Sequence, residues 1–131
     1  MINKIAKIAA DNIRVERTGK IVIADDGDGV YHLFKLPKKS LVLGFHIEIL
    51  TAPTDGGDDP TLKVGYLGNG EVSGDDDYFS ADAAPLTEGM KSYTKPKWFV
   101  DAGGALTATY ASEDAVGNLE IRAFAVYTVI H

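Results

Sequence analysis

The stretch LVLGFHIEIL, residues 41–50, alternates large apolar side chains with more varied ones over ten positions. Apolar residues recur at every second position, which is the side-chain period of a β-strand and not of a helix. The residues that share this predicted face are Leu41, Leu43, Phe45, Ile47 and Ile49. The intervening positions include a glycine, a histidine and a glutamate. The pattern predicts a strand with one buried face and one wetter face.

Six further segments have the composition of strands, and strings rich in Gly, Asp, Asn and Pro separate them. They are residues 20–25, 29–36, 61–67, 95–101, 105–111 and 119–130. After the first twenty residues no long stretch has helical periodicity. The chain is therefore predicted to be all-β, with the strands in an antiparallel β-sandwich or a small barrel.

The N-terminal segment lacks the strand-like alternation of the rest of the chain. INKIAKIAADNI, residues 2–13, fits a short helix and an extended arm equally well. The expected organisation is an N-terminal arm over residues 1–20 and a single β-sandwich domain over residues 21–131.

Charge is unevenly distributed along a chain whose net charge is −6. Residues 1–20 carry five basic and two acidic side chains, whereas residues 55–82 carry eight acids and a single lysine. The net charge argues against nucleic acid as a partner, because phosphates would be repelled. The chain has no cysteine and no apolar run long enough to cross a membrane, so neither a thiolate metal site nor a membrane partner is expected.

Three consecutive aspartates, Asp75, Asp76 and Asp77, raise the question of a metal site. In an extended segment, neighbouring side chains point to opposite sides, so three adjacent carboxylates are not expected to converge on one ion. Aspartate and glycine also suit turns for local reasons, because the carboxylate accepts hydrogen bonds from nearby backbone amides. We therefore expect a solvated turn and assign no metal ligand and no cofactor.

Catalytic motifs are missing from the sequence. The chain has no nucleophile elbow, no paired zinc-binding histidines and no phosphate-binding loop. His46 and Glu48 share one strand face without a further catalytic group nearby in the sequence, and His32 stands alone in another strand. We assign no catalytic residue and expect a protein that is not an enzyme.

One part of the chain resembles a known class. LPKKSLVLGFHIEILTAP, DPTLKVGYLGN and DDDYFSADAAPLTEGM, all within Leu36 to Met90, resemble a recurrent pattern in small structural proteins of tailed bacteriophages. The matching positions are Leu36 and Pro37 at a strand entry, Pro60 to Leu62 with Val64 and Gly65 in a central strand, and Asp77 to Phe79 at the return.

The resemblance implies an antiparallel β-sandwich of jelly-roll type. It also implies a capsid decoration, or cement, protein that stabilises the head shell. Its expected partners are the major capsid protein and other copies of itself, in a homodimer or homotrimer. It would lie on the outer surface of the virion after synthesis in the cytoplasm of the bacterial host. The expected partner contacts are Lys4, Lys7, Arg14, Arg17, Phe124, Val126 and Ile130.

The last three of these residues lie on the less buried side of the predicted C-terminal strand. Because both of its sides are largely apolar, cover is expected from the N-terminal arm, from the rest of the chain or from a neighbouring subunit. The alternative function is a carbohydrate- or calcium-binding β-sandwich module of a phage tail or fibre, with Trp98, Tyr93 and Tyr110 as its ligand face. An enzyme of cupin or lipocalin shape is a third reading, disfavoured by three scattered histidines.

Overall fold

The computed structural model describes residues 13–54, 60–80, 84–100 and 102–130, and these residues form ten strands and no helix. The strands are β1 (Ile13–Arg17), β2 (Ile21–Ile23), β3 (Gly29–Leu36), β4 (Ser40–Thr51), β5 (Thr61–Tyr66), β6 (Ala84–Pro85), β7 (Gly89–Tyr93), β8 (Lys97–Phe99), β9 (Gly104–Ala111) and β10 (Leu119–Val129). The prediction of an all-β fold is confirmed. Nothing in this part of the chain is a helix that could span a membrane.

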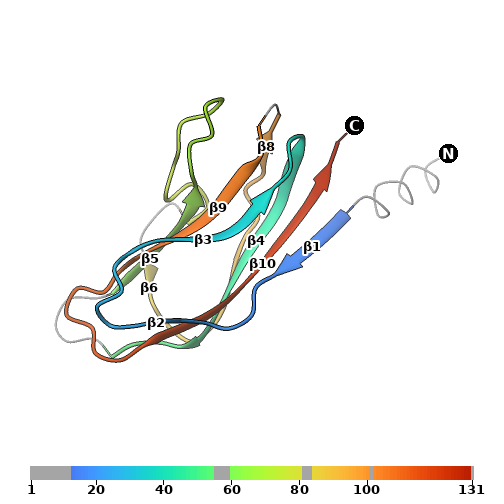
Figure 1. Cartoon of the computed structure of the whole chain (residues 1–131). Helices are drawn as coiled ribbons and strands as arrows, with labels where there is room; N and C mark the ends of the chain where they lie inside the picture. The colour runs from blue at the N-terminus through green and yellow to red at the C-terminus, as the bar shows by residue number, and fades with distance from the viewer. Residues whose placement is uncertain (1–12, 55–59, 81–83, 101, 131) are drawn as a thin grey trace.

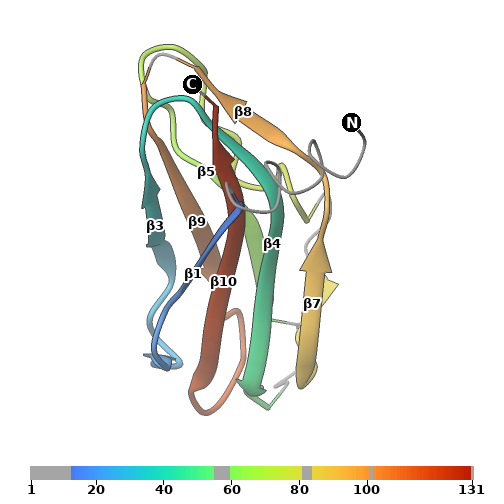
Figure 2. The ribbon, with the colours of Figure 1, turned by 90° about the vertical axis from the view of Figure 1, so that its right-hand side faces the viewer.

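The strands form two antiparallel sheets. In the six-stranded sheet β10 and β4 are central, with β1 beside β10 and β7 and β8 sharing the edge beside β4 (Figure 2). β2 shares the edge beside β10 with β1. The four-stranded sheet has the order β3-β9-β5-β6 and lies against the first (Figure 1). The chain crosses from sheet to sheet several times, and the narrower expectation of a jelly roll stays a prediction.

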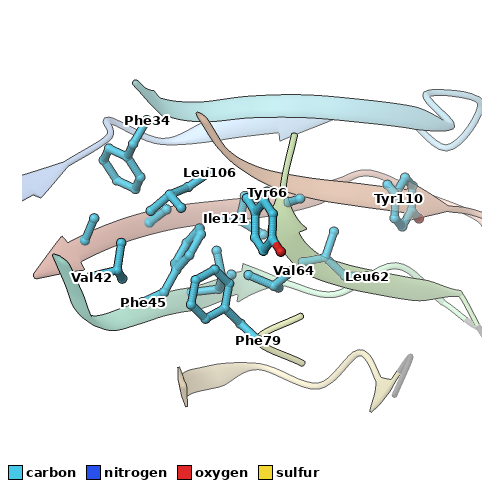
Figure 3. Packing of buried hydrophobic residues seen from close by; sticks show 14 of the residues in the cluster. Phe34, Val42, Phe45, Leu62, Val64, Tyr66, Phe79, Leu106, Tyr110 and Ile121 are labelled. Atoms are coloured by element: carbon cyan, nitrogen blue, oxygen red, sulfur yellow. The ribbon is translucent and has the colours of Figure 1, made fainter. Parts of the chain in front are cut away.

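The core fills the space between the two sheets (Figure 3). Phe34 of the four-stranded sheet packs edge-to-face on Phe45 of the six-stranded sheet, with ring centroids 6.0 Å apart. Phe45 in turn contacts Phe79, at 5.4 Å, and Tyr66 contacts Phe99, at 5.6 Å. Such pairs add to the burial energy of the aromatic rings and fix how the two sheets face each other.

The face predicted for residues 41–50 is correct in its second half and wrong in its first half. Phe45, Ile47 and Ile49 are buried, as expected, but Val42 is completely buried and Leu43 is 36% exposed. The reason is a β-bulge: Val126 pairs with Gly44 and Tyr127 pairs with Val42, so Leu43 is an extra residue. The bulge reverses the alternation, and the residues before it, Leu41 included, point the other way.

β10 has the two faces that its sequence predicts. Leu119, Ile121, Ala123, Ala125 and Tyr127 are buried in the core, and the alternate residues are half-buried on the other side. β1 lies beside β10 in the sheet, with Val15 opposite Val126. Residues 13–17 of the expected arm are therefore a strand, whereas the choice between helix and extended chain falls on residues that lie outside the described ones.

Candidate interaction surface

One face of the six-stranded sheet points away from the four-stranded sheet, and we call it the outer face (Figure 2). Residues paired across an antiparallel sheet point to the same side, so the pairing assigns side chains to this face. Val15 pairs with Val126, Arg17 with Phe124, and Leu41 with Trp98. The apolar side chains of the outer face are Ile13, Val15, Leu41, Leu43, Met90, Trp98, Phe124 and Val126, and Ile130 continues the row beyond β10.

The exposed apolar side chains of the described residues gather on this face. Nine large hydrophobic residues are exposed, and Ile13, Val15, Leu43, Met90, Trp98 and Ile130 belong to the outer face. Val22, which pairs with Glu120 on the same side, extends it, and only Val30 and Val116 lie elsewhere. Exposed apolar side chains that gather on one face of a small protein indicate a surface that can bind another protein.

The polar side chains of the outer face are largely paired with one another. Arg122 donates from Nε and Nη2 to the same oxygen of Glu48, at 3.1 and 2.9 Å. His46 Nδ1 lies 2.9 Å from the Ser92 hydroxyl oxygen. Such internal pairing leaves little unsatisfied polarity, so a partner can cover these groups at a modest desolvation cost.

Arg17 differs from these groups, because it has no acidic partner among the residues that the structure describes. It is exposed at the end of β1, opposite Phe124. Together with Thr18, Gly19 and Arg122 these two residues line a surface hollow of about 390 Å³. A carboxylate of a partner could enter this hollow and pair with the Arg17 guanidinium.

The predicted contact residues divide between the two sides of the sheet. Phe124, Val126 and Ile130 lie on the outer face, as does Arg17. Arg14 pairs with the buried Tyr127 and so belongs to the inner side of the edge, and Lys4 and Lys7 lie outside the described residues. Four residues of this surface were not predicted from the sequence: Ile13, Val15, Leu43 and Met90. β1 and β7 lack a clear alternating pattern, and the bulge turns Leu43 to the face opposite to the one predicted.

The three consecutive aspartates do come together, which corrects the expectation that they would diverge. Asp75 forms a bridge to Tyr66, and Asp76 and Asp77 lie in the expected turn, so the alternation of an extended segment does not hold here. One carboxylate oxygen from each of the three lies within 4.8 Å of the others. Asp75 bonds through its backbone to Tyr66 and accepts the Asp77 N–H on its side chain, at 3.3 Å. A side-chain hydrogen bond in which the protonated Asp77 carboxyl donates to Asp75, together with partial burial and the charges of Asp75 and Asp76, raises the pKa of the Asp77 carboxyl.

The aromatic residues of the alternative sugar-binding site do not share a face. Trp98 lies on the outer face, whereas Tyr110 is 1% exposed within the core. Tyr93 pairs with Phe45 and points to the inner side, where burial raises the pKa of its hydroxyl. A stacking platform needs ring faces that a sugar can reach together, and these three rings do not provide one.

Two remaining features, the His46–Ser92 pair and a surface hollow beside β3, lack the arrangement of a catalytic site. His46 bonds to Ser92, but Glu48 on the same face is bound by Arg122, so the histidine gains no orienting carboxylate from it. The larger surface hollow, about 620 Å³, lies beside β3 and includes His32, Lys35 and Asn69. The Asn69 side chain is engaged in bonds to the backbone at Glu71, Val72 and Gly103, which is a structural role.

Comparison with known proteins gives similarity in structure without similarity in sequence. No family model matches the chain, and no curated protein matches it in sequence. Its fold is similar to that of a chain in the capsid asymmetric unit of cyanophage Pam1, with a TM-score of 0.65, 19% identity and coverage of 91% of this chain and 86% of that one.

Two other capsid structures contain similar chains. One is the capsid of Ralstonia phage GP4, with a TM-score of 0.64, 14% identity and coverage of 91% and 85%. The other is the acidic stable capsid of Helicobacter pylori bacteriophage KHP30, with a TM-score of 0.58, 15% identity and coverage of 89% and 93%. The resemblance to phage structural proteins predicted from Leu36 to Met90 is thus confirmed at the level of the fold.

Proposed function

We propose that this chain is a non-enzymatic structural protein of a bacteriophage virion, a decoration or cement protein that binds the outer surface of the head. The observation that carries the proposal is the outer face: a chain with the fold of capsid components collects its exposed apolar side chains on one side of one sheet. The matched capsid chains are covered over most of their length, so they are comparably small.

The proposed mechanism is mechanical. Each copy lays its outer face across neighbouring subunits of the major capsid protein and removes apolar surface from water. Pulling the subunits apart would expose that surface again, at a cost of about 25 cal/mol per Å². Contacts of the same kind repeated over a shell convert a modest affinity for each site into a large gain for the whole particle.

The charge of the chain supports a place outside the shell. A protein with a net charge of −6 is repelled by packaged nucleic acid and is well solvated on a surface that faces water. We place its synthesis in the cytoplasm of the bacterial host and its assembly, as a homodimer or homotrimer, on the finished head. The basic side chains Lys4 and Lys7 would add contacts to acidic groups of the shell.

A pair of matched variants tests the proposal. Ile130 and Val30 are exposed to similar extents, 44% and 49%, but only Ile130 belongs to the outer face. Capsids prepared without this chain are mixed with each purified variant, sedimented and analysed for bound protein. We expect Ile130→Glu to reduce binding by about tenfold, because it places a charge in an apolar contact, and Val30→Glu to bind like the unmodified chain. Equal binding of both variants, or no binding of the unmodified chain, would refute the proposal.

A deletion tests whether the N-terminal arm contributes to shell binding in addition to the six-stranded sheet. Removing residues 1–12 leaves strand β1 intact and takes away Lys4 and Lys7. If these residues contact the shell, the shortened chain will bind more weakly, and added salt will reduce the difference from the full chain. Unchanged retention on capsids would remove the arm from the mechanism.

Among the residues that the structure describes, the calcium-binding alternative is left with the Asp75–Asp77 turn. Its carboxylates already serve the turn, and Lys63 lies 3.9 Å from Asp76. We expect the melting temperature of the chain to be the same with calcium and with a chelator. A fall of many degrees on chelation would favour the alternative over the decoration protein.

A further inference from the structure

The edge of the six-stranded sheet at β1 is open. Strand β1 pairs with β10 on one side, no other described strand pairs with it, and all five of its residues are exposed (Figure 1). An open edge presents backbone N–H and C=O groups that can pair with another strand. Natural proteins commonly protect such edges with charges, so the charges on β1 decide what this edge can bind.

The backbone groups of β1 that face outward can be identified from its neighbour. Thr18, one residue beyond β1, donates its N–H to the Ala123 carbonyl, at 2.9 Å, in the register that pairs β1 with β10. Hydrogen-bonded and non-hydrogen-bonded pairs alternate in antiparallel sheets. Arg14 and Glu16 therefore direct their backbone groups toward β10, and Ile13, Val15 and Arg17 direct theirs away from the sheet.

The sequence of β1, IRVER, is complementary to itself in an antiparallel arrangement. If Val15 is placed opposite Val15 of a second copy, Arg14 lies opposite Glu16 and Glu16 lies opposite Arg14. Centring the pairing one residue earlier or later would instead oppose two arginines or two glutamates. Opposite charges across neighbouring strands stabilise a sheet and like charges destabilise it, so the charges select one register.

The same register uses the outward backbone groups. Val15 would exchange two hydrogen bonds with its counterpart, and Ile13 and Arg17 would exchange the others, so that no outward N–H or C=O of β1 stays unpaired. We propose that β1 is a homodimer interface, through which two copies of this chain join their six-stranded sheets edge to edge about a two-fold axis at Val15.

Pairing of two copies through β1 would also fix how their outer faces are oriented. A two-fold axis between antiparallel strands of one sheet runs perpendicular to the sheet, so both outer faces point to the same side. Two copies would present one apolar surface of double width. Dimerisation would occur with or without a capsid, so failure of shell binding leaves it intact, and the reverse also holds.

Charge exchange tests the interface on the full-length chain. Arg14→Glu places glutamate opposite glutamate at two positions of the dimer, and Glu16→Arg places arginine opposite arginine at the same two positions. Each variant should therefore raise the dissociation constant of the dimer, measured by analytical ultracentrifugation, by about tenfold or more. An equimolar mixture of the two variants restores both opposite-charge pairs and should dimerise again. Because Glu16 also accepts a hydrogen bond from the Tyr127 hydroxyl, at 2.7 Å, melting curves confirm that each variant is folded.

The mixture is the decisive sample, because a variant that merely unfolded would not be rescued by the other. An unmodified chain that sediments as a monomer at all concentrations, or as a trimer, would overturn the proposal. A dimer whose dissociation constant is unchanged in both variants would overturn it as well.

Discussion

Gly65 lies in β5 next to the acidic turn, and the lack of a side chain there makes room for that turn. A Cβ atom at this position would lie 2.0 Å from the Asp75 carbonyl oxygen, which accepts a hydrogen bond from the Tyr66 N–H. The collision is with backbone and cannot be relieved by a rotamer change. We expect Gly65→Ala to lower the free energy of unfolding by about 2 kcal/mol or more, measured by urea denaturation.

Gly19→Ala is the control for this change, because nothing lies within 4 Å of the added methyl group. If both variants unfold at the same urea concentration, the close approach of β5 and the acidic turn is wrong.

Asp28 ties two loops together at one end of the sandwich. One of its oxygens accepts hydrogen bonds from the Ser112 N–H, at 2.9 Å, and from the Ser112 hydroxyl, and these bonds lower the pKa of the carboxyl below its usual 3.8. Because the pKa is lower in the folded state than in the unfolded state, the charged carboxylate stabilises the fold at pH values above the unfolded pKa of 3.8. This contribution is lost as the pH falls through the lowered pKa.

The prediction for Asp28 is therefore specific to pH. Asp28→Asn should reduce the melting temperature at neutral pH, and the difference from the unmodified chain should shrink below pH 3.8. Asp26→Asn in the same loop is the control and should have little effect at either pH. A difference for Asp28→Asn that is constant across this range would contradict the role of the charge.

At the scale of the element, the bulge in β4 decides which residues reach the core. Strict alternation buries Leu43 and exposes Val42, and the structure has the reverse, with exposed fractions of 36% and 0%. We expect Val42→Ala to cost about 2 kcal/mol in unfolding free energy, from two lost methyl groups and a cavity, and Leu43→Ala to cost less than about 1 kcal/mol. Chemical denaturation of the two variants measures both values. A larger loss of unfolding free energy for Leu43→Ala than for Val42→Ala would contradict the bulge.

The strands that the sequence predicts and those that it misses differ in burial. β3, β5, β9 and β10 lie within a residue of their expected bounds, since each alternates and carries β-branched or aromatic side chains. β1 has five exposed residues, three of them charged, and β7 is largely exposed. Both are held as edge strands by backbone pairing to β10 and β4, which leaves no hydrophobic pattern to recognise.

The candidate surface was predictable in part for the same reason. The apolar outer positions of β10, Phe124 and Val126, follow from the two-sided pattern of the last strand. Met90 and Trp98 join them only because β7 and β8 pair with β4, and no local pattern encodes that pairing. Contacts between segments far apart in the chain assemble the surface.

At the scale of the whole molecule, charge and apolar surface are separated. Acidic side chains gather in turns, as in DDGD at residues 25–28 and GDDD at residues 74–77, and charged turns of this kind favour contact with water. The outer face keeps its few charges mostly in pairs, such as Arg122 with Glu48 and Lys20 with Glu120.

The central claim is that the outer face is covered by the capsid shell. Its most direct test is an electron cryomicroscopy reconstruction of capsids carrying this chain, at a resolution that orients the sandwich. The account predicts that the sheet of β1, β10, β4 and β7 lies against the shell, with Phe124 and Val126 in the contact. A sandwich attached through its four-stranded sheet or its turns, with the outer face open to water, would contradict it.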